Sequence, residues 1–149
     1  MSENDPFRIF ASHGWQLDED YLRLFEYLES TTNFFYQNVL PADSAPEGES
    51  IANRRTRILD AMKQAEVVLV CSGQHERFRD WIDFEISAAK AHRLPIVLIE
   101  PFGPNDAPAD LKSVADQIVG WSSRSLEDAI RVQARQDESK RFDMLDFDL

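Results

Sequence analysis

Two short, uninterrupted aliphatic runs limit what this chain can fold into. Residues 67–71 and 96–99 hold only valine, isoleucine and leucine, apart from one cysteine. A strand that is apolar at every position must be covered on both faces, which is the environment of a central strand in a parallel sheet. Residues 81–92, between the runs, have the apolar spacing of a helix, which is the usual connection between parallel strands.

The rest of the chain extends this alternation of strands and helices. Further strands are expected at residues 7–11, 33–39 and 117–121. Helices are expected at residues 17–30, from a cap at Ser50 or Asn53 to residue 64, and from a cap at Asp80 to residue 92. A last helix is expected from its cap at Ser125 to residue 134. The pattern predicts one α/β domain with a flavodoxin-like, mainly parallel five-stranded sheet, order 2-1-3-4-5, and helices on both faces. This domain is expected over residues 7–134, between a flexible N-terminus (1–6) and an acidic, hydrophobic tail (135–149).

Composition excludes several classes of protein. The single cysteine, Cys71, lies in an apolar run, so an internal disulfide is impossible and a buried, inert thiol is expected. The net charge of −11 disfavours a nucleic-acid partner. No basic leader precedes an apolar stretch and no apolar run approaches the ~18 residues of a membrane span, so a cytoplasmic protein without membrane contact is expected.

A ligand is expected at the carboxyl ends of the first and third strands. Ligands of open parallel sheets bind there because the strand order reverses at that point. The loops at this position, residues 12–15 and 72–79, are polar and each contains a glycine and a histidine. Neither loop has the glycine pattern of a dinucleotide or phosphate site, and the three histidines lack the spacing of metal ligands, so no metal is expected.

Glu85 is the most informative residue of the sequence. At about 100° per residue, it falls in the middle of the apolar face of the helix after the third strand. A carboxylate there costs several kcal/mol unless it is paired or functional, and burial raises its pKa. Two interpretations remain open: Glu85 is catalytic, or it anchors a loop through backbone N–H groups or an arginine. Trp81, one turn earlier, is by itself more typical of core than of a ligand contact.

Several motifs resemble Toll/interleukin-1 receptor-like (TIR-like) domains of bacteria and archaea. Residues 81–85, Trp-Ile-Asp-Phe-Glu, match the Trp-x-x-x-Glu motif of TIR domains. Residues 10–15, Phe-Ala-Ser-His-Gly-Trp, are similar to the first-strand motif Phe-Ile-Ser-His-Ser-Trp, with departures at Ala11 and Gly14. Residues 67–73, 95–103 and 115–121 follow in the family's order, so the resemblance covers about residues 7–131. Within this branch the chain resembles TIR proteins of Thoeris antiphage defence.

The resemblance implies an enzyme that cleaves NAD⁺ as its substrate, without a cofactor. It would release nicotinamide and make an ADP-ribose-type signal, often cyclic, that activates a separate effector. Glu85 is then the catalytic residue. The expected substrate-binding residues are Ser12, His13, Gly14, Trp15, Ser72 and Trp81. The loop at 41–50 corresponds to a mobile TIR loop that mediates self-association, so a homo-oligomer or other TIR domains are expected as partners.

Two alternatives remain beside this hypothesis. The first is a non-catalytic TIR adaptor that acts by assembly, although an adaptor would not need a carboxylate on an apolar helix face. The second is a nucleoside deoxyribosyltransferase-like enzyme, which shares the fold style and a catalytic glutamate.

The final eight residues interleave five large apolar side chains with three aspartates. This pattern favours a tail that docks on the chain itself or on a neighbouring copy.

Overall fold

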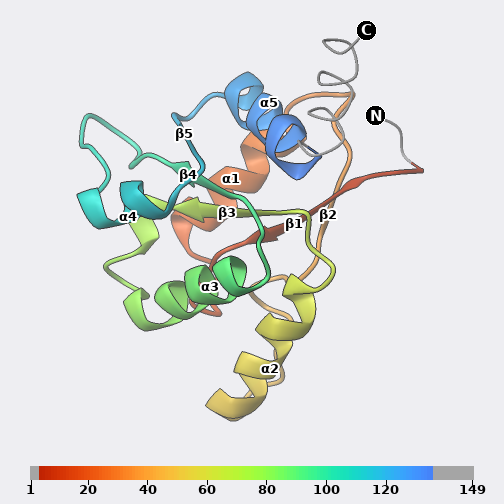
Figure 1. Ribbon diagram of the computed structural model, residues 1–149, viewed down its shortest axis with the longest axis vertical. Coiled ribbons are helices and arrows are strands. Elements are labelled where there is room, and N and C mark those ends of the chain that lie inside the picture. Colours follow the sequence, from red (N-terminus) through yellow and green to blue (C-terminus); the bar gives the residue numbers. More distant parts are fainter. Residues whose placement is uncertain (1–3, 136–149) are drawn as a thin grey trace, which may run out of the picture.

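The structure, a computed structural model, describes residues 4–135 and confirms the expected α/β architecture (Figure 1). The strands are β1 (Phe7–Ala11), β2 (Tyr36–Asn38), β3 (Val67–Cys71), β4 (Ile96–Ile99) and β5 (Gln117–Val119). The helices are α1 (Glu19–Glu29), α2 (Ile51–Met62), α3 (Arg79–Ala91), α4 (Ala109–Val114) and α5 (Ser123–Ala134). All strands pair in parallel in the order β2-β1-β3-β4-β5.

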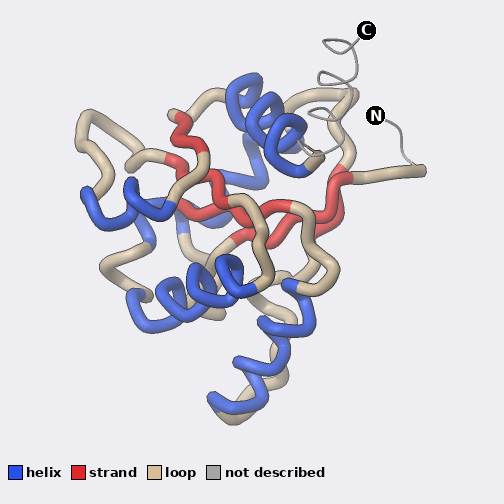
Figure 2. Tube along the Cα trace, in the orientation of Figure 1, coloured by secondary structure: helices blue, strands red, loops and turns tan. Residues whose placement is uncertain are grey.

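The helices cover both faces of the sheet. Helices α1 and α5 pack on one face, and α2, α3 and α4 on the other (Figures 1 and 2). Side chains alternate between the faces: Val67 and Leu69 of β3 join the core under α1 and α5, whereas Val68 and Val70 join the core over α3. All five residues of β3 and all four of β4 are buried, as their aliphatic composition predicted.

Helix ends were less predictable than helix positions. Ser50 caps α2, one of the two candidates, and its side chain accepts a hydrogen bond from the Asn53 backbone. The predicted cap at Asp80 is wrong, because α3 already begins at Arg79 and Asp80 lies in its first turn. There its carboxylate still interacts favourably with the helix dipole. The predicted cap at Ser125 is also wrong, because the extended residue Ser122 caps α5 by accepting from the Ser125 N–H.

The loop at residues 41–50 is anchored near both ends. Ala42 is buried and donates its backbone N–H to the Tyr21 hydroxyl, 3.0 Å away. Near the other end, Glu49 accepts two hydrogen bonds from the Arg57 guanidinium. These contacts leave the middle of the loop as its most exposed part. The predicted C-terminal tail, apart from residue 135, lies outside the described residues, and the division of the chain into three segments remains a prediction.

Candidate active site

The loops after β1 and β3 lie together at the carboxyl edge of the sheet. Ala11 at the end of β1 is in register with Leu69 of β3, and the next residue, Ser12, donates its N–H to the Leu69 carbonyl at 2.8 Å. A short 3-10 turn, η1 (Ser72–Gln74), follows β3 and leads into α3. The strand order reverses here, which is where a ligand site was expected.

Glu85 lies on the face of α3 that packs toward this edge. Its side chain has no exposed surface, and its neighbours along the helix, Ile82, Ile86 and Ala89, are buried in the apolar core. One carboxylate oxygen, Oε1, accepts the backbone N–H of His13 at 3.0 Å. The other, Oε2, is buried and has no hydrogen-bond partner among residues 4–135. Helical spacing had therefore predicted the position of Glu85 correctly.

Burial raises the pKa of Glu85 well above the usual value of a glutamate. The His13 N–H and the nearby Ser12 side chain act in the opposite direction, because both favour the ionised form. The single bond to a backbone N–H corresponds to the loop-anchoring interpretation of this residue. It employs Oε1 alone. Oε2 lies with the Ser12 side chain nearby and has no hydrogen bond within residues 4–135, so it can accept one from a ligand.

His13 orders the loop after β1 through its ring. Nδ1 accepts the Trp15 backbone N–H at 3.0 Å, so Nε2 carries the proton and donates to the Leu40 carbonyl at 3.1 Å. Burial lowers the pKa of His13 to about 4, so the ring is neutral at physiological pH. The ring packs against Phe10, Trp15 and Tyr21. His13 therefore contacts Glu85 through its backbone, while both ring nitrogens bond elsewhere within the protein.

Two tryptophans and an arginine lie beside this loop. Trp15 packs edge-on against Trp81 of α3, with ring centroids 6.0 Å apart, and the Arg54 guanidinium lies 5.4 Å over the Trp15 ring. Trp15 is buried, and its indole N–H has no partner within residues 4–135. Its backbone adopts φ = 63°, a conformation unusual for a large side chain. Such strained residues occur often at binding sites.

The structure assigns Gly14 and Ser72 more specific contacts than the sequence indicated. A side chain at Gly14 would collide with the Phe78 ring, so Phe78 already occupies the space that a larger residue at position 14 would fill. The Ser72 hydroxyl donates to the Ile99 carbonyl at 2.8 Å and so bridges the ends of β3 and β4. A substrate contact by either residue remains a prediction.

Sequence reasoning missed Gln74 and His75. Both follow β3 in what was predicted only as a polar loop, and polar loop residues are normally solvated. Gln74 is completely buried, with both amide atoms unpaired among the described residues. His75 is also buried and pairs through Nε2 with Asp83 of α3 at 2.7 Å. Only the folded path of the loop reveals that these side chains turn inward.

Unpaired polar atoms are concentrated at this edge. Within residues 4–135, seven buried side-chain nitrogen or oxygen atoms have no hydrogen-bond partner. Five of them belong to Ser12, Trp15, Gln74 and Glu85, and a sixth belongs to Arg54 over the Trp15 ring. Buried polar groups are normally satisfied, so such a cluster is typical of a site that completes its hydrogen bonds with a ligand. We refer to Ser12, Trp15, Gln74 and Glu85 as the unpaired cluster.

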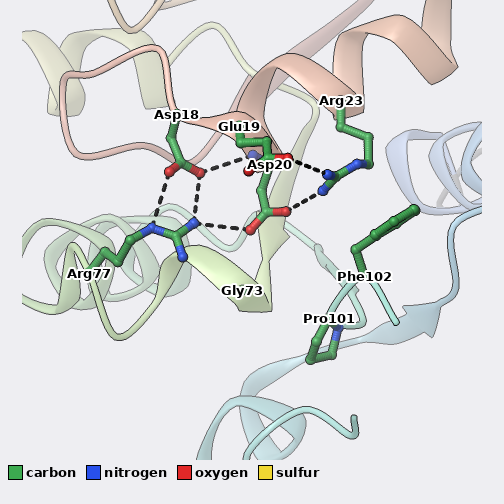
Figure 3. Close-up of a pocket in the computed structure, with 8 residues that line it drawn as sticks. All are labelled: Asp18, Glu19, Asp20, Arg23, Gly73, Arg77, Pro101 and Phe102. Atoms are coloured by element: carbon green, nitrogen blue, oxygen red, sulfur yellow. Dashed lines mark hydrogen bonds and ion pairs between the residues drawn. The ribbon is translucent and has the colours of Figure 1, made fainter. Parts of the chain in front are cut away.

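A separate hollow of about 480 Å³ opens at the same edge (Figure 3). Its lining residues are Asp18, Glu19, Asp20, Arg23, Gly73, Arg77, Pro101 and Phe102. Arg77 bonds to Asp18 and Asp20, and Arg23 bonds to Asp20 and Glu19, so the charges of this hollow are paired with each other. None of the predicted site residues lines it. We refer to it as the ionic hollow.

Within residues 4–135 no three histidine, cysteine or acidic side chains are grouped to hold a metal ion. The absence of a metal site nevertheless stays a prediction. Cys71 is buried, and burial raises the pKa of its thiol. The described part of the chain also has no helix with the length and apolar character needed to cross a bilayer.

Fold and site together define a parallel α/β domain with a carboxylate buried beneath the carboxyl edge of its sheet. A family model described as "Thoeris protein ThsB, TIR-like domain" matches residues 10–106, which include the end of β1, all of β3 and α3, and the unpaired cluster. The chain therefore belongs to this TIR-like family and is a TIR-domain protein of antiphage defence. A search of curated proteins found no match.

Proposed function

We propose that this protein cleaves the bond between nicotinamide and ribose in NAD⁺ and makes an ADP-ribose-type signal for a separate effector. The observation that carries the proposal is the Glu85 carboxylate, fully buried with one oxygen unpaired in a TIR-like domain. The product is cyclic where a group of the same nucleotide accepts the ribose, and linear where water does. NAD⁺ is the substrate, and the proposed reaction needs no metal or further cofactor.

The proposed role of Glu85 is electrostatic. As the C1′–N bond breaks, its electron pair leaves with nicotinamide, and positive charge develops on the ribose through an oxocarbenium-like transition state. A carboxylate in a desolvated site stabilises this charge strongly. Nicotinamide in NAD⁺ is cationic before cleavage and departs neutral, so no general acid is required. Approach of the cationic ring also offsets the burial that raises the pKa of Glu85, and thus favours its ionised form.

The residues around Glu85 have proposed roles in holding the carboxylate and in binding the substrate. The His13 backbone holds Oε1 and directs Oε2 to the substrate, while the Ser12 hydroxyl is available for a ribose hydroxyl. Trp15 and Trp81 present aromatic rings on which the nicotinamide ring can stack. Gly14 and Ser72 shape the loops that hold these groups.

Access to the site must be controlled, because Glu85 has no exposed surface. We propose that assembly with further copies, or with other TIR domains, shifts the loops after β1 and β3 and admits NAD⁺. The net charge of −11 makes nucleic acid an unsuitable partner. Cytoplasmic NAD⁺ is the substrate pool that this proposal requires.

The test is nicotinamide release from NAD⁺, measured by chromatography at increasing protein concentration. We expect activity that rises more steeply than concentration, and its loss in Glu85→Gln. Glu76→Gln is the matched control, because Glu76 is exposed in the neighbouring loop and should retain activity. Equal turnover by wild type and Glu85→Gln would exclude the catalytic assignment.

A non-catalytic adaptor is the second candidate. One observation favours it: Glu85 Oε1 already anchors the His13 backbone, which is a structural role. In that case Glu85→Gln should alter assembly with other TIR domains, while no preparation of the wild type releases nicotinamide. The family match gives no support to the deoxyribosyltransferase-like alternative.

A further inference from the structure

Gln74 is the residue of the unpaired cluster to which no role has yet been given. It ends the 3-10 turn η1, which connects β3 to α3 at the carboxyl edge of the sheet. Its side chain has no exposed surface, and neither the amide oxygen nor the amide nitrogen has a hydrogen-bond partner among residues 4–135. Gln74 is thus the one residue of the cluster with two unpaired polar atoms.

The backbone around Gln74 is held firmly. Its carbonyl accepts the Phe78 N–H at 3.0 Å, and the Phe78 ring fills the space in front of Gly14. On the other side, a Cβ at Gly73 would meet the Asp20 carboxylate. The turn therefore lies against the first turn of α1 at Gly73, and Phe78, four residues after Gln74, packs against the loop after β1.

Two unpaired amide atoms at such a place require a physical explanation. A buried donor or acceptor without a partner loses its hydrogen bonds to water and receives nothing in return. An apolar side chain of the same length would avoid that loss. Gln74 follows β3 at the same carboxyl edge where Glu85 bonds to the His13 backbone, so a ligand bound at this edge could supply the missing partners.

We propose that Gln74 is a substrate-recognition residue whose amide pairs with a donor–acceptor edge of the dinucleotide. A primary amide offers one donor direction and one acceptor direction side by side, so its complement is a group with both. NAD⁺ has such groups at both ends: the carboxamide of nicotinamide, and adenine through its N6/N1 or N6/N7 edge. The inference rests on the proposed function, which it deepens by naming the part of the substrate that is recognised.

The first test measures stability. Gln74→Met keeps the length of the side chain but removes both polar atoms, and Gln74→Leu serves if the methionine variant fails to fold. We expect the melting temperature of the ligand-free protein to rise by about 2–5 °C, because two unsatisfied groups disappear. The control, Gln64→Met, changes an exposed glutamine before β3 and should leave the melting temperature unchanged. A fall at Gln74 together with unchanged ligand binding would overturn the inference.

The second test identifies the recognised edge. Binding is measured by calorimetry, and cleavage by release of the pyridine base. Three ligands are compared: NAD⁺, the 3-acetylpyridine analogue that lacks the amide N–H donors, and the purine analogue that lacks the adenine amino group. We expect wild type to bind one analogue at least about tenfold more weakly than NAD⁺, since paired hydrogen bonds are lost. In Gln74→Met that discrimination should collapse, with KM for NAD⁺ raised and kcat changed much less. The analogue that shows the effect identifies the edge.

The outcomes separate this inference from the proposed function. If wild type cleaves NAD⁺ and the variant retains both its KM and its discrimination, the inference is wrong and the function stands. If wild type binds NAD⁺ without cleaving it, and the variant loses that binding, the inference stands and the function is wrong. If wild type neither binds nor cleaves NAD⁺ at any concentration, both are wrong.

Discussion

The carboxyl edge of the sheet has two polar regions of opposite character. The ionic hollow is open and partly exposed, and its five charged side chains pair with one another (Figure 3). The unpaired cluster is buried, carries one carboxylate, and has five polar atoms without a partner in the described part of the chain, residues 4–135. The hollow is built mainly from the start of α1 and the segment after β3, whereas the cluster combines the loop after β1, the turn after β3 and helix α3. The two regions therefore differ in composition as well as in burial and pairing.

This difference distinguishes a structural polar region from a functional one. Arg77 is half-exposed, so its ion pairs are screened by water and contribute little to stability. The pair between Arg23 and Asp20 is largely buried but is complete within the protein. Buried unpaired groups reduce stability and persist where another requirement maintains them. The ionic hollow has the shape of a binding pocket, but the unpaired cluster has the stronger physical indication of a reactive site.

The largest expected effect is a loss of catalysis confined to the unpaired cluster. Glu85→Gln should lower nicotinamide release by at least about a hundredfold, because a charge that stabilises the transition state is removed. Asp20→Asn, the corresponding change in the ionic hollow, should stay within about twofold of wild type. Both rates are measured in one assay at equal protein concentration. Similar losses in the two variants would show that the hollow also takes part in the reaction.

The second expected effect is on the pH dependence of stability, to which His13 and Glu85 contribute in opposite directions. His13 has its pKa lowered from 6.5 to about 4, so its contribution to stability is complete above pH 6.5 and is lost as pH falls toward 4, a change of about 3 kcal/mol. Glu85 has its pKa raised, so it lowers stability as pH rises above its usual value of 4.5. In wild type the two changes partly cancel between pH 4.5 and 6.5.

Thermal melts of wild type and Glu85→Gln across this range separate the two groups. In the variant only the His13 change remains, so its melting temperature should fall more steeply on acidification than that of wild type. At pH 7 the variant should melt at the same or a higher temperature, because a buried charge has been neutralised. Parallel pH curves for the two proteins would contradict this account of the cluster.

A third, intermediate effect tests the packing around the cluster. Gly14→Ala should destabilise the fold by about 1–3 kcal/mol, because the new methyl group collides with the Phe78 ring. Phe78→Leu combined with Gly14→Ala should recover part of this loss, since the two positions share one space. Chemical denaturation measures both variants. Additive losses in the double variant would mean that the two side chains do not compete.

The smallest effect is expected in the ionic hollow. Arg77 is half-exposed, so Arg77→Gln should change stability by less than about 1 kcal/mol despite the loss of its bonds to Asp18 and Asp20. The difference from wild type should shrink further in high salt. Denaturation at two salt concentrations checks this. A large loss of stability that does not depend on salt would contradict this distinction between the hollow and the cluster.

Much of the fold could be predicted because it follows from local patterns in the sequence. The aliphatic composition of β3 and β4 required burial on both faces, and helical spacing placed Glu85 on the inner face of α3. In α1 the buried residues are Tyr21, Leu24 and Leu28, whereas Leu22 is exposed, a distinction that apolar composition alone does not make. Helix α4, only six residues long, gave no recognisable periodicity.

The sequence alone determined the order of elements, the parallel sheet and the burial of Glu85, because each depends on periodicities of a few neighbouring residues. Only the tertiary structure decided that the Glu85 carboxylate has one bonded and one free oxygen, and that His13 uses both ring nitrogens internally. Only the tertiary structure decided that Gln74 turns inward. The bonds of His13 to Glu85 and Leu40 join residues 72 and 27 positions apart, and a separation of that size leaves no local pattern.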